Sequence, residues 1–317
     1  MSEANRVQDE LVEAFRLGDE ARTRALLARL GPGPRQVRAA LESLLGSPES
    51  LRRQAAAFGL GELGEASSTG LLEQQLAIEE AHGGPEGAAV AEVITQALGR
   101  IKEAGARASL VKRLERLTAG APSPAQVYTL VYALWKQRHP DLLPAVRRGL
   151  QSLAPPASDG LRGLCMLLEK SPDALRAWVA DLSVPLSHKT QVLTVLDAEV
   201  PEALLPTFPA FISLAQRAAD GEGTAGGYWE CLLSVLLAHR EQVLPTLSAE
   251  ARETLRTVVV ELVASKDPDC SLRAAVLLQD IGRPEDAAVI EAHRPEDSIG
   301  AHAFDEAARA LRHKQEP

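Results

Sequence analysis

The chain has 317 residues and a formal net charge of −9 at pH 7, so the molecule as a whole should repel nucleic acid and anionic membranes. Hydrophobic residues make up 45% of the sequence but aromatic residues only 3%, which indicates a core of Leu, Ala and Val between closely packed helices. Cys165, Cys231 and Cys270 lie far apart and match no CxxC spacing, so we expect neither a zinc site nor a disulfide framework.

The N-terminal residues, Met-Ser-Glu-Ala-Asn, are polar and acidic where a secretory signal would be basic and then apolar. The longest apolar runs, such as residues 257–263, are interrupted by charge well before the ~20 residues that span a bilayer. We therefore expect a soluble, cytoplasmic protein without membrane insertion.

The first predicted element is a helical hairpin over residues 4–30, which we expect to close the N-terminal end of the fold. Val7, Leu11 and Ala14 recur at helical spacing and make one apolar stripe. Gly18 ends this helix, and Asp19 is placed to cap a second helix. Gly-Pro-Gly-Pro at 31–34 then stops the hairpin.

The stretch from Ser47 to Glu80 contains a turn, an Ala-rich helix that ends in Leu-Gly-Glu-Leu-Gly, a break and a Leu-spaced helix. The same hairpin recurs 38 positions later, where matched positions carry matched residues: Leu60, Gly61, Leu63, Leu72 and Leu76 fall on Leu98, Gly99, Ile101, Leu110 and Leu114. A period of this size predicts an all-α fold, an α-solenoid of stacked antiparallel helix pairs. A glycine inside a helix costs about 1 kcal/mol relative to Ala, so we expect Gly61 to serve close contact between repeats.

This order of an Arg, small residues, Leu-Gly-x-Ile/Leu-Gly and Leu-rich turns resembles the HEAT-like repeats, of HEAT/PBS-lyase type, found in short bacterial helical-repeat proteins. Residues 271–291 fit the pattern again, through Leu278, Ile281 and Gly282. The resemblance implies a HEAT-like superhelix, and we expect a single solenoid over 1–317. Its predicted parts are clear repeats at 35–117 and 265–292, irregular repeats at 122–262, the N-terminal cap hairpin at 4–30 and a C-terminal cap helix at 299–314. In the irregular part, Pro206 and Pro209 predict a kinked or divided helix over 201–219.

No serine, histidine or acid lies in a nucleophile elbow, a metal-spaced pair or a paired-carboxylate motif. We therefore assign no catalytic residue, no metal and no cofactor. The pattern favours a non-catalytic scaffold or adaptor that holds a protein partner on the concave face of the solenoid.

A nucleic-acid-binding protein is the alternative. Two HEAT-like families carry out chemistry: one attaches bilins to light-harvesting proteins, and the other, which this chain resembles in repeat style, removes alkylated bases from DNA. Residues 100–148 contain ten Lys and Arg residues against three acids, together with Tyr128, Tyr132 and Trp135, which could stack on bases. In the resembled family the Leu-Gly helices line the concave face, so only Arg100, Lys136 and Arg138 would point inward, and the other cations, Arg113 among them, would lie outside.

The predicted binding face consists of positions on the Leu-Gly helices that packing between neighbours leaves free. On three successive repeats these positions are Gln54, Phe58 and Glu62; Glu92, Gln96 and Arg100; and Tyr128, Tyr132 and Lys136. Stacked side by side, they would form one patch of mixed charge with an aromatic centre, which is typical of surfaces that anchor a protein segment. The alternative is that Phe58 and the tyrosines are buried between helices.

Overall fold

The computed structural model describes residues 3–31, 33–218, 225–296 and 298–314. Across these ranges it contains nineteen α-helices and five short 3-10 helices, and no β-strand. The predicted all-α fold of packed helix pairs is confirmed. The chain divides into two compact units, residues 1–161 and 162–317, with the boundary inside one helix, and each unit is described by itself. The single continuous solenoid over 1–317 stays a prediction.

Unit 1 is built from nine complete helices and the start of a tenth, counted over its described residues. They are α1 (Glu3–Arg16), α2 (Glu20–Leu27), α3 (Pro34–Leu45), α4 (Ser50–Leu63), α5 (Thr69–His82), α6 (Gly84–Arg100), α7 (Ala104–Thr118), α8 (Pro124–Lys136), α9 (Leu143–Ser152) and α10 (Asp159–Glu169). The Asp19 carboxylate accepts a hydrogen bond from the Arg22 backbone N–H at 2.9 Å, so Asp19 caps α2 as its position predicts.

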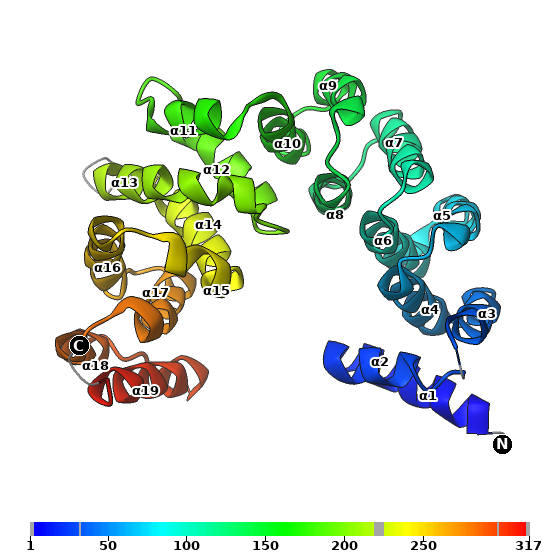
Figure 1. The fold of residues 1–317 in the computed structure, drawn as a ribbon, viewed down its shortest axis with the longest axis horizontal. Helices are drawn as coiled ribbons and strands as arrows, with labels where there is room; N and C mark the ends of the chain where they lie inside the picture. Colours follow the sequence, from blue (N-terminus) through cyan, green and yellow to red (C-terminus); the bar gives the residue numbers. More distant parts are fainter. Residues whose placement is uncertain (1–2, 32, 219–224, 297, 315–317) are drawn as a thin grey trace. The chain divides into compact units, whose positions relative to one another are not determined.

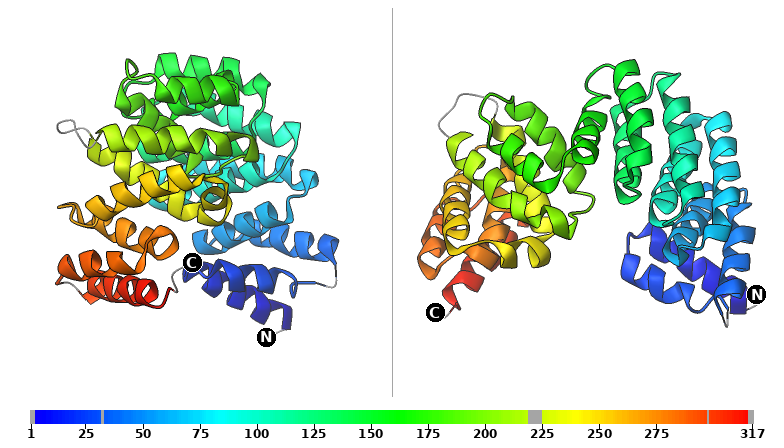
Figure 2. Two further views of the ribbon diagram at one scale, coloured as in Figure 1. Left: turned by 60° about the vertical axis from the view of Figure 1, so that its left-hand side comes forward. Right: turned by 45° about the horizontal axis from the view of Figure 1, so that its top comes forward.

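The helices of unit 1 alternate between two rows (Figure 1). The inner row, α4, α6 and α8, lies on the inside of the curve that this unit follows, and the outer row contains α3, α5, α7 and α9. Successive inner helices pack on each other, and among the outer helices α3 packs on α4, α5 on α6, and α7 on both α6 and α8. Both views of Figure 2 show the same succession in the blue to green helices. The inner row therefore places equivalent residues of successive repeats side by side.

Two glycines set how closely the inner helices approach. A methyl group at Gly61 of α4 would lie 2.7 Å from the Cα atom of Ala97 on α6. One at Gly99 of α6 would lie 2.9 Å from the Cα atom of Ala133 on α8. Backbone cannot retreat from such contacts as a flexible side chain can, so only glycine fits here. This geometry is the close contact between repeats expected from the sequence.

Unit 2 begins within α10 and has shorter, less regular helices. They are α11 (Pro172–Ala180), α12 (Leu186–Leu196), α13 (Phe208–Ala218), α14 (Ala225–Ala238), α15 (Arg240–Val243), α16 (Ala249–Leu262), α17 (Pro268–Ile281), α18 (Ala287–Ala292) and α19 (Ser298–Arg312). The break expected at Pro206 is present: a 3-10 helix over Glu202–Thr207 runs directly into α13. The four-residue helix α15 was not expected, because no hydrophobic period distinguishes it.

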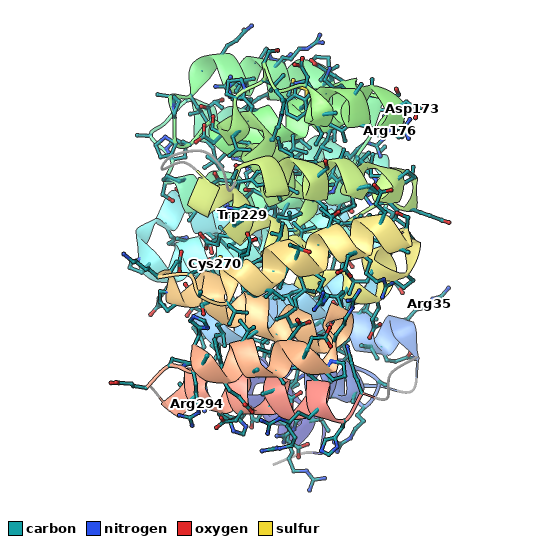
Figure 3. The ribbon with its side chains drawn as sticks, turned by 90° about the vertical axis from the view of Figure 1, so that its left-hand side faces the viewer. Arg35, Asp173, Arg176, Trp229, Cys270 and Arg294 are labelled. Atoms are coloured by element: carbon teal, nitrogen blue, oxygen red, sulfur yellow. The ribbon has the colours of Figure 1, made fainter. Side chains whose placement is uncertain are left out.

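The core of unit 2 contains aromatic side chains and buried thiols. The rings of Phe208 and Phe211 lie 6.0 Å apart, and the buried Tyr228 hydroxyl donates a hydrogen bond of 2.8 Å to the Phe211 carbonyl. Cys270 on α17 and Trp229 on α14 are both buried, and these two helices pack on each other (Figure 3). Burial raises the pKa of the Cys270 thiol. Among the described helices, none combines the length and apolar content needed to cross a bilayer.

Candidate functional site

The nine residues of the predicted binding face lie on the three inner helices, which pack directly on one another. Their exposure differs. The Gln96 side chain on α6 is exposed and Phe58 on α4 is buried, whereas the seven others are partly exposed: Gln54, Glu62, Glu92, Arg100, Tyr128, Tyr132 and Lys136. The row is thus continuous along the unit, with Gln96 as its most accessible member.

The Phe58 side chain is buried and is not accessible to a partner on this face. Only 4% of the residue is exposed, and its ring lies 5.7 Å from the ring of Phe15 on α1. The Arg100 guanidinium covers the ring at 5.0 Å from the ring centroid, with Arg24 at 6.0 Å. Burial between helices, the alternative reading, therefore holds for Phe58: the N-terminal hairpin packs against α4 and covers the position.

A ladder of ion pairs crosses the face above Phe58. The Glu62 carboxylate on α4 accepts a hydrogen bond of 2.7 Å from Arg24 Nε on α2 and lies 3.3 Å from Arg100 Nε on α6. Successive members of this set are 38 positions apart, and the contacts join the N-terminal hairpin to two successive repeats. The ion pairs of the ladder hold the heads of Arg24 and Arg100 beside Glu62.

The tyrosines at the α8 end of the face are only partly exposed. A methyl group at Gly160, in the first turn of α10, would lie 3.0 Å from ring atoms of Tyr128, so this ring rests against α10. Tyr132 and Lys136 lie one and two turns further along α8. The aromatic centre expected for the patch is therefore reduced to part of two tyrosine rings.

The cations of the basic segment 100–148 are largely matched by acids, several of which belong to the preceding repeat. Lys112 pairs with Glu73, and both Arg113 and Arg116 pair with Glu80 of α5. Two more pairs lie within the segment, Arg107 with Asp141 and Arg148 with Glu115. Counting charge along the sequence missed the α5 acids, which come within reach only through the stacking. Less positive charge is available to phosphate groups than the segment's composition indicates.

Arg113 was expected on the outside of the fold, but its side chain is buried. Its side chain is 1% exposed and donates a hydrogen bond of 2.8 Å to the Ala91 carbonyl of α6. Burial lowers the pKa of Arg113 to about 10, against the opposing effect of the nearby Glu80 and Glu92 carboxylates. The residue ties α7 to α6 and is not available to a large ligand.

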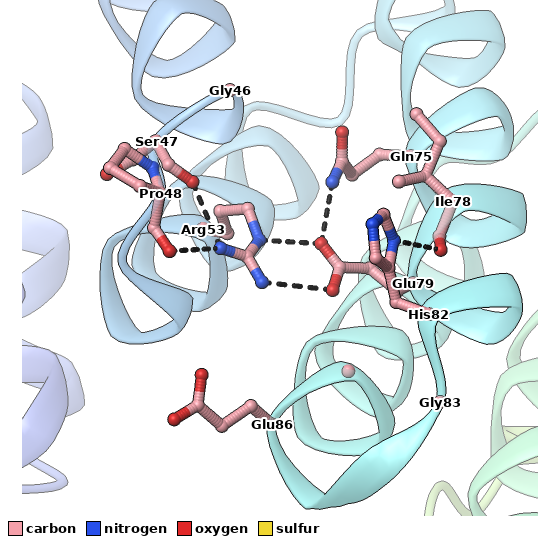
Figure 4. A pocket seen from close by; sticks show the side chains of 11 residues that line it. Gly46, Ser47, Pro48, Arg53, Gln75, Ile78, Glu79, His82, Gly83 and Glu86 are labelled. Atoms are coloured by element: carbon pink, nitrogen blue, oxygen red, sulfur yellow. Dashed lines mark hydrogen bonds and ion pairs between the residues drawn. The ribbon is translucent and has the colours of Figure 1, made fainter.

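A cavity of 520 Å³ opens between the α3–α4 turn and the α5–α6 turn (Figure 4). Arg53 and Glu79 lie at its centre and form a two-point ion pair with N–O distances of 2.6 and 3.0 Å. Arg53 Nη1 also donates to the carbonyls of Ser47 and Pro48, and Gln75 Nε2 donates to Glu79 at 2.6 Å. This network ties the two turns together.

Sequence reasoning missed Arg24, Arg53 and Glu79 as members of these networks. For Arg24 a signal existed, because it precedes Glu62 by the same 38 positions that separate Glu62 from Arg100. For Arg53 and Glu79 there was none, since their spacing of 26 positions reflects only how two hairpins meet. In the described part of the chain, no three His, Cys, Asp or Glu side chains are grouped to hold a metal ion.

Fold and face together define a helical-repeat protein whose inner row presents equivalent positions of successive repeats. No family model matches the sequence, and no curated protein matches it. Among solved structures, the chain is similar to human deoxyhypusine hydroxylase, determined in complex with glycerol, with 17% sequence identity and a TM-score of 0.37. The similarity covers 98% of this chain and 96% of the hydroxylase chain.

Proposed function

We propose that this protein is a non-catalytic, cytoplasmic scaffold that holds a protein segment along the inner row of unit 1. The observation that carries the proposal is the ladder of Arg24, Glu62 and Arg100, which joins the N-terminal hairpin to two successive repeats. Side chains held by neighbours lose little further freedom when a partner binds, so such a surface is preorganised. The ladder offers charges of both signs beside the exposed amide of Gln96.

Only part of the predicted binding face is accessible to a partner. Phe58 supports the face from below, because Arg100 covers its ring. Gln96 of α6 occupies the matching position one repeat later and is exposed, and Tyr132 of α8 is partly exposed at the next. We therefore place the centre of the binding surface at Gln96 and Tyr132, with the ladder along one side.

Affinity capture with substitutions on each row tests this proposal. Gln96→Arg places a long charged side chain at the centre of the inner row and should reduce capture of the partner at least about tenfold, as expected for a central interface position. Gln74→Arg makes the same change at an exposed position of α5 in the outer row and is the matched control. Wild type and Gln74→Arg should capture the same protein, with or without nuclease. Equal capture by both variants would contradict the proposed face.

The nuclease treatment also addresses the nucleic-acid alternative. Were the 100–148 segment bound to a nucleic acid, nuclease would abolish capture and added salt would weaken it steeply. The acids paired with Lys112, Arg113 and Arg116 argue for a protein partner instead.

A further inference from the structure

We propose that the cavity between the α3–α4 and α5–α6 turns binds an arginine side chain presented by another polypeptide. The cavity is lined by residues of the two turns, of α5 and of the first turns of α4 and α6, and none of the nine residues of the inner-row face lines it. The proposal therefore does not rest on the scaffold function proposed for the inner row, and each can fail without the other.

The hydrogen-bond donors at the centre of the cavity are already engaged. Arg53 directs Nε and Nη2 to Glu79, and Nη1 to the Ser47 and Pro48 carbonyls. The Gln75 amide directs its nitrogen to Glu79. His82 Nδ1 lies 2.8 Å from the Ile78 carbonyl, which can only accept, so Nδ1 carries the proton.

These same bonds leave acceptors unused on two residues that line the cavity. With its proton on Nδ1, neutral His82 has an acceptor lone pair on Nε2, and Gln75 retains its amide oxygen. Glu86, in the first turn of α6, makes no hydrogen bond or ion pair to any other residue that lines the cavity (Figure 4). A ligand that donates hydrogen bonds and accepts none matches this set of groups.

The charge of the lining selects a cation. Arg53 and Glu79 neutralise each other through their two-point pair, and His82 in its neutral form adds no charge. The Glu86 carboxylate therefore gives the lining of the cavity one unbalanced negative charge. A guanidinium carries one positive charge and five donors in a planar fork, which can engage a carboxylate at two points while other donors reach nearby acceptors.

The walls suit the aliphatic stem of such a side chain. Ile78 lines the cavity and is one of four large hydrophobic residues that are exposed in the described part of the chain, at 39%. Pro48 lines the opposite turn. Long basic side chains lay their methylene groups along apolar surface while the charged head reaches polar groups. The volume of 520 Å³ lies within the range of sites that enclose a small ligand.

The test is a titration of isotope-labelled full-length protein, followed by backbone amide NMR signals, with Nα-acetyl-L-arginine methylamide as the probe. We expect saturable shifts confined to residues that line the cavity. The citrulline analogue replaces the guanidinium by a neutral urea of the same shape and should produce none. Glu86→Gln and Ile78→Ala should each weaken probe binding about threefold or more, while Glu261→Gln, at an exposed acid of α16, should not change it.

Three results would overturn the proposal. They are the absence of saturable shifts, equal shifts with the citrulline analogue, and wild-type affinity in both Glu86→Gln and Ile78→Ala. A fourth measurement addresses the source of the guanidinium, since agmatine carries the same group without an amino-acid backbone. Tighter binding of agmatine than of the arginine probe would point to a small amine and contradict a polypeptide ligand.

Discussion

The inner helices of unit 1 and the helices α12, α14 and α17 of unit 2 both stack side by side, but different residues make the contacts between them. In unit 1, Gly61 and Gly99 let neighbouring backbones touch. In unit 2, side chains reach across instead: Ser234 of α14 donates to Asp197 at 2.9 Å, and Arg273 of α17 donates to the Glu230 carbonyl at 3.3 Å. Helices thus stack in both units, with glycine at the contacts of α4, α6 and α8 and polar side chains between α12, α14 and α17.

The repeat signature fades between residues 122 and 262, a range that begins in unit 1 and includes α12 and α14 of unit 2. The Leu-Gly pattern records how closely two helices approach, and the side-chain contacts of α12, α14 and α17 do not depend on it. Gly163 of α10 is informative here, since a methyl group at this position would overlap the Gln191 carbonyl oxygen of α12. Where unit 2 does bring two backbones together, a glycine is again present.

The largest expected effect concerns a feature that both units share, a buried arginine–carboxylate pair. Arg53 holds Glu79 in unit 1, and Arg256 holds Asp286 in unit 2, with carboxylate side chains that are 3% and 4% exposed. Arg53→Met and Arg256→Met should each cost about 3–5 kcal/mol of unfolding free energy, because each leaves a buried charge unpaired. Urea denaturation measures this cost.

An exposed pair provides the control for that measurement. Arg16 and Glu13 lie at the surface of α1, so Arg16→Met should leave the unfolding free energy almost unchanged. The double variant Arg53→Met/Glu79→Leu should recover much of the stability lost in Arg53→Met, because it removes the unpaired charge. A similar loss in the Arg16 and Arg53 variants would show that the Arg53–Glu79 pair is not buried in solution.

The glycine contacts come next in expected size. Gly61→Ala forces a methyl group against the Ala97 backbone and should cost about 1–3 kcal/mol. Gly70→Ala, on α5 with open space around the new methyl group, should be neutral or stabilising by up to about 1 kcal/mol. Thermal or urea denaturation of the two variants compares them directly. If the order of stability were reversed, close backbone contact would not be the reason for the Leu-Gly signature.

A substitution of Tyr228 tests how much a buried hydrogen bond of unit 2 contributes to stability. Its buried hydroxyl donates to the Phe211 carbonyl, so Tyr228→Phe removes one hydrogen bond between α14 and α13. We expect a loss of about 1 kcal/mol in unfolding free energy. Unchanged stability in urea would mean that the hydroxyl contributes nothing to the packing of α13 against α14.

The smallest effect is expected for the ladder on the inner row. Glu62→Gln removes the charge that faces Arg24 and Arg100 but keeps the shape of the side chain. Because the pairs are partly exposed, the loss should be at most about 1 kcal/mol and should shrink as salt is added. A loss that is independent of salt would contradict the electrostatic origin of the ladder.

Much of the fold follows from the sequence, because hydrophobic spacing and glycine position are local signals. The 38-residue shift predicted that Glu62 and Arg100 occupy equivalent places, and the two side chains form an ion pair. Side-chain burial could not be derived in the same way. Phe58 is covered by the N-terminal hairpin, and the acids that neutralise the 100–148 segment come from α5. Both depend on how one hairpin meets the next, which no local pattern records.

The central claim, that the inner row of unit 1 holds a protein segment, is tested most directly by photo-crosslinking in living cells. A photoreactive phenylalanine analogue is placed at position 96 on α6 or, as the control, at position 74 on α5, both exposed in the structure. We predict a defined protein adduct from position 96 and none from position 74. An adduct from position 74 alone, or no protein adduct from position 96, would contradict the account.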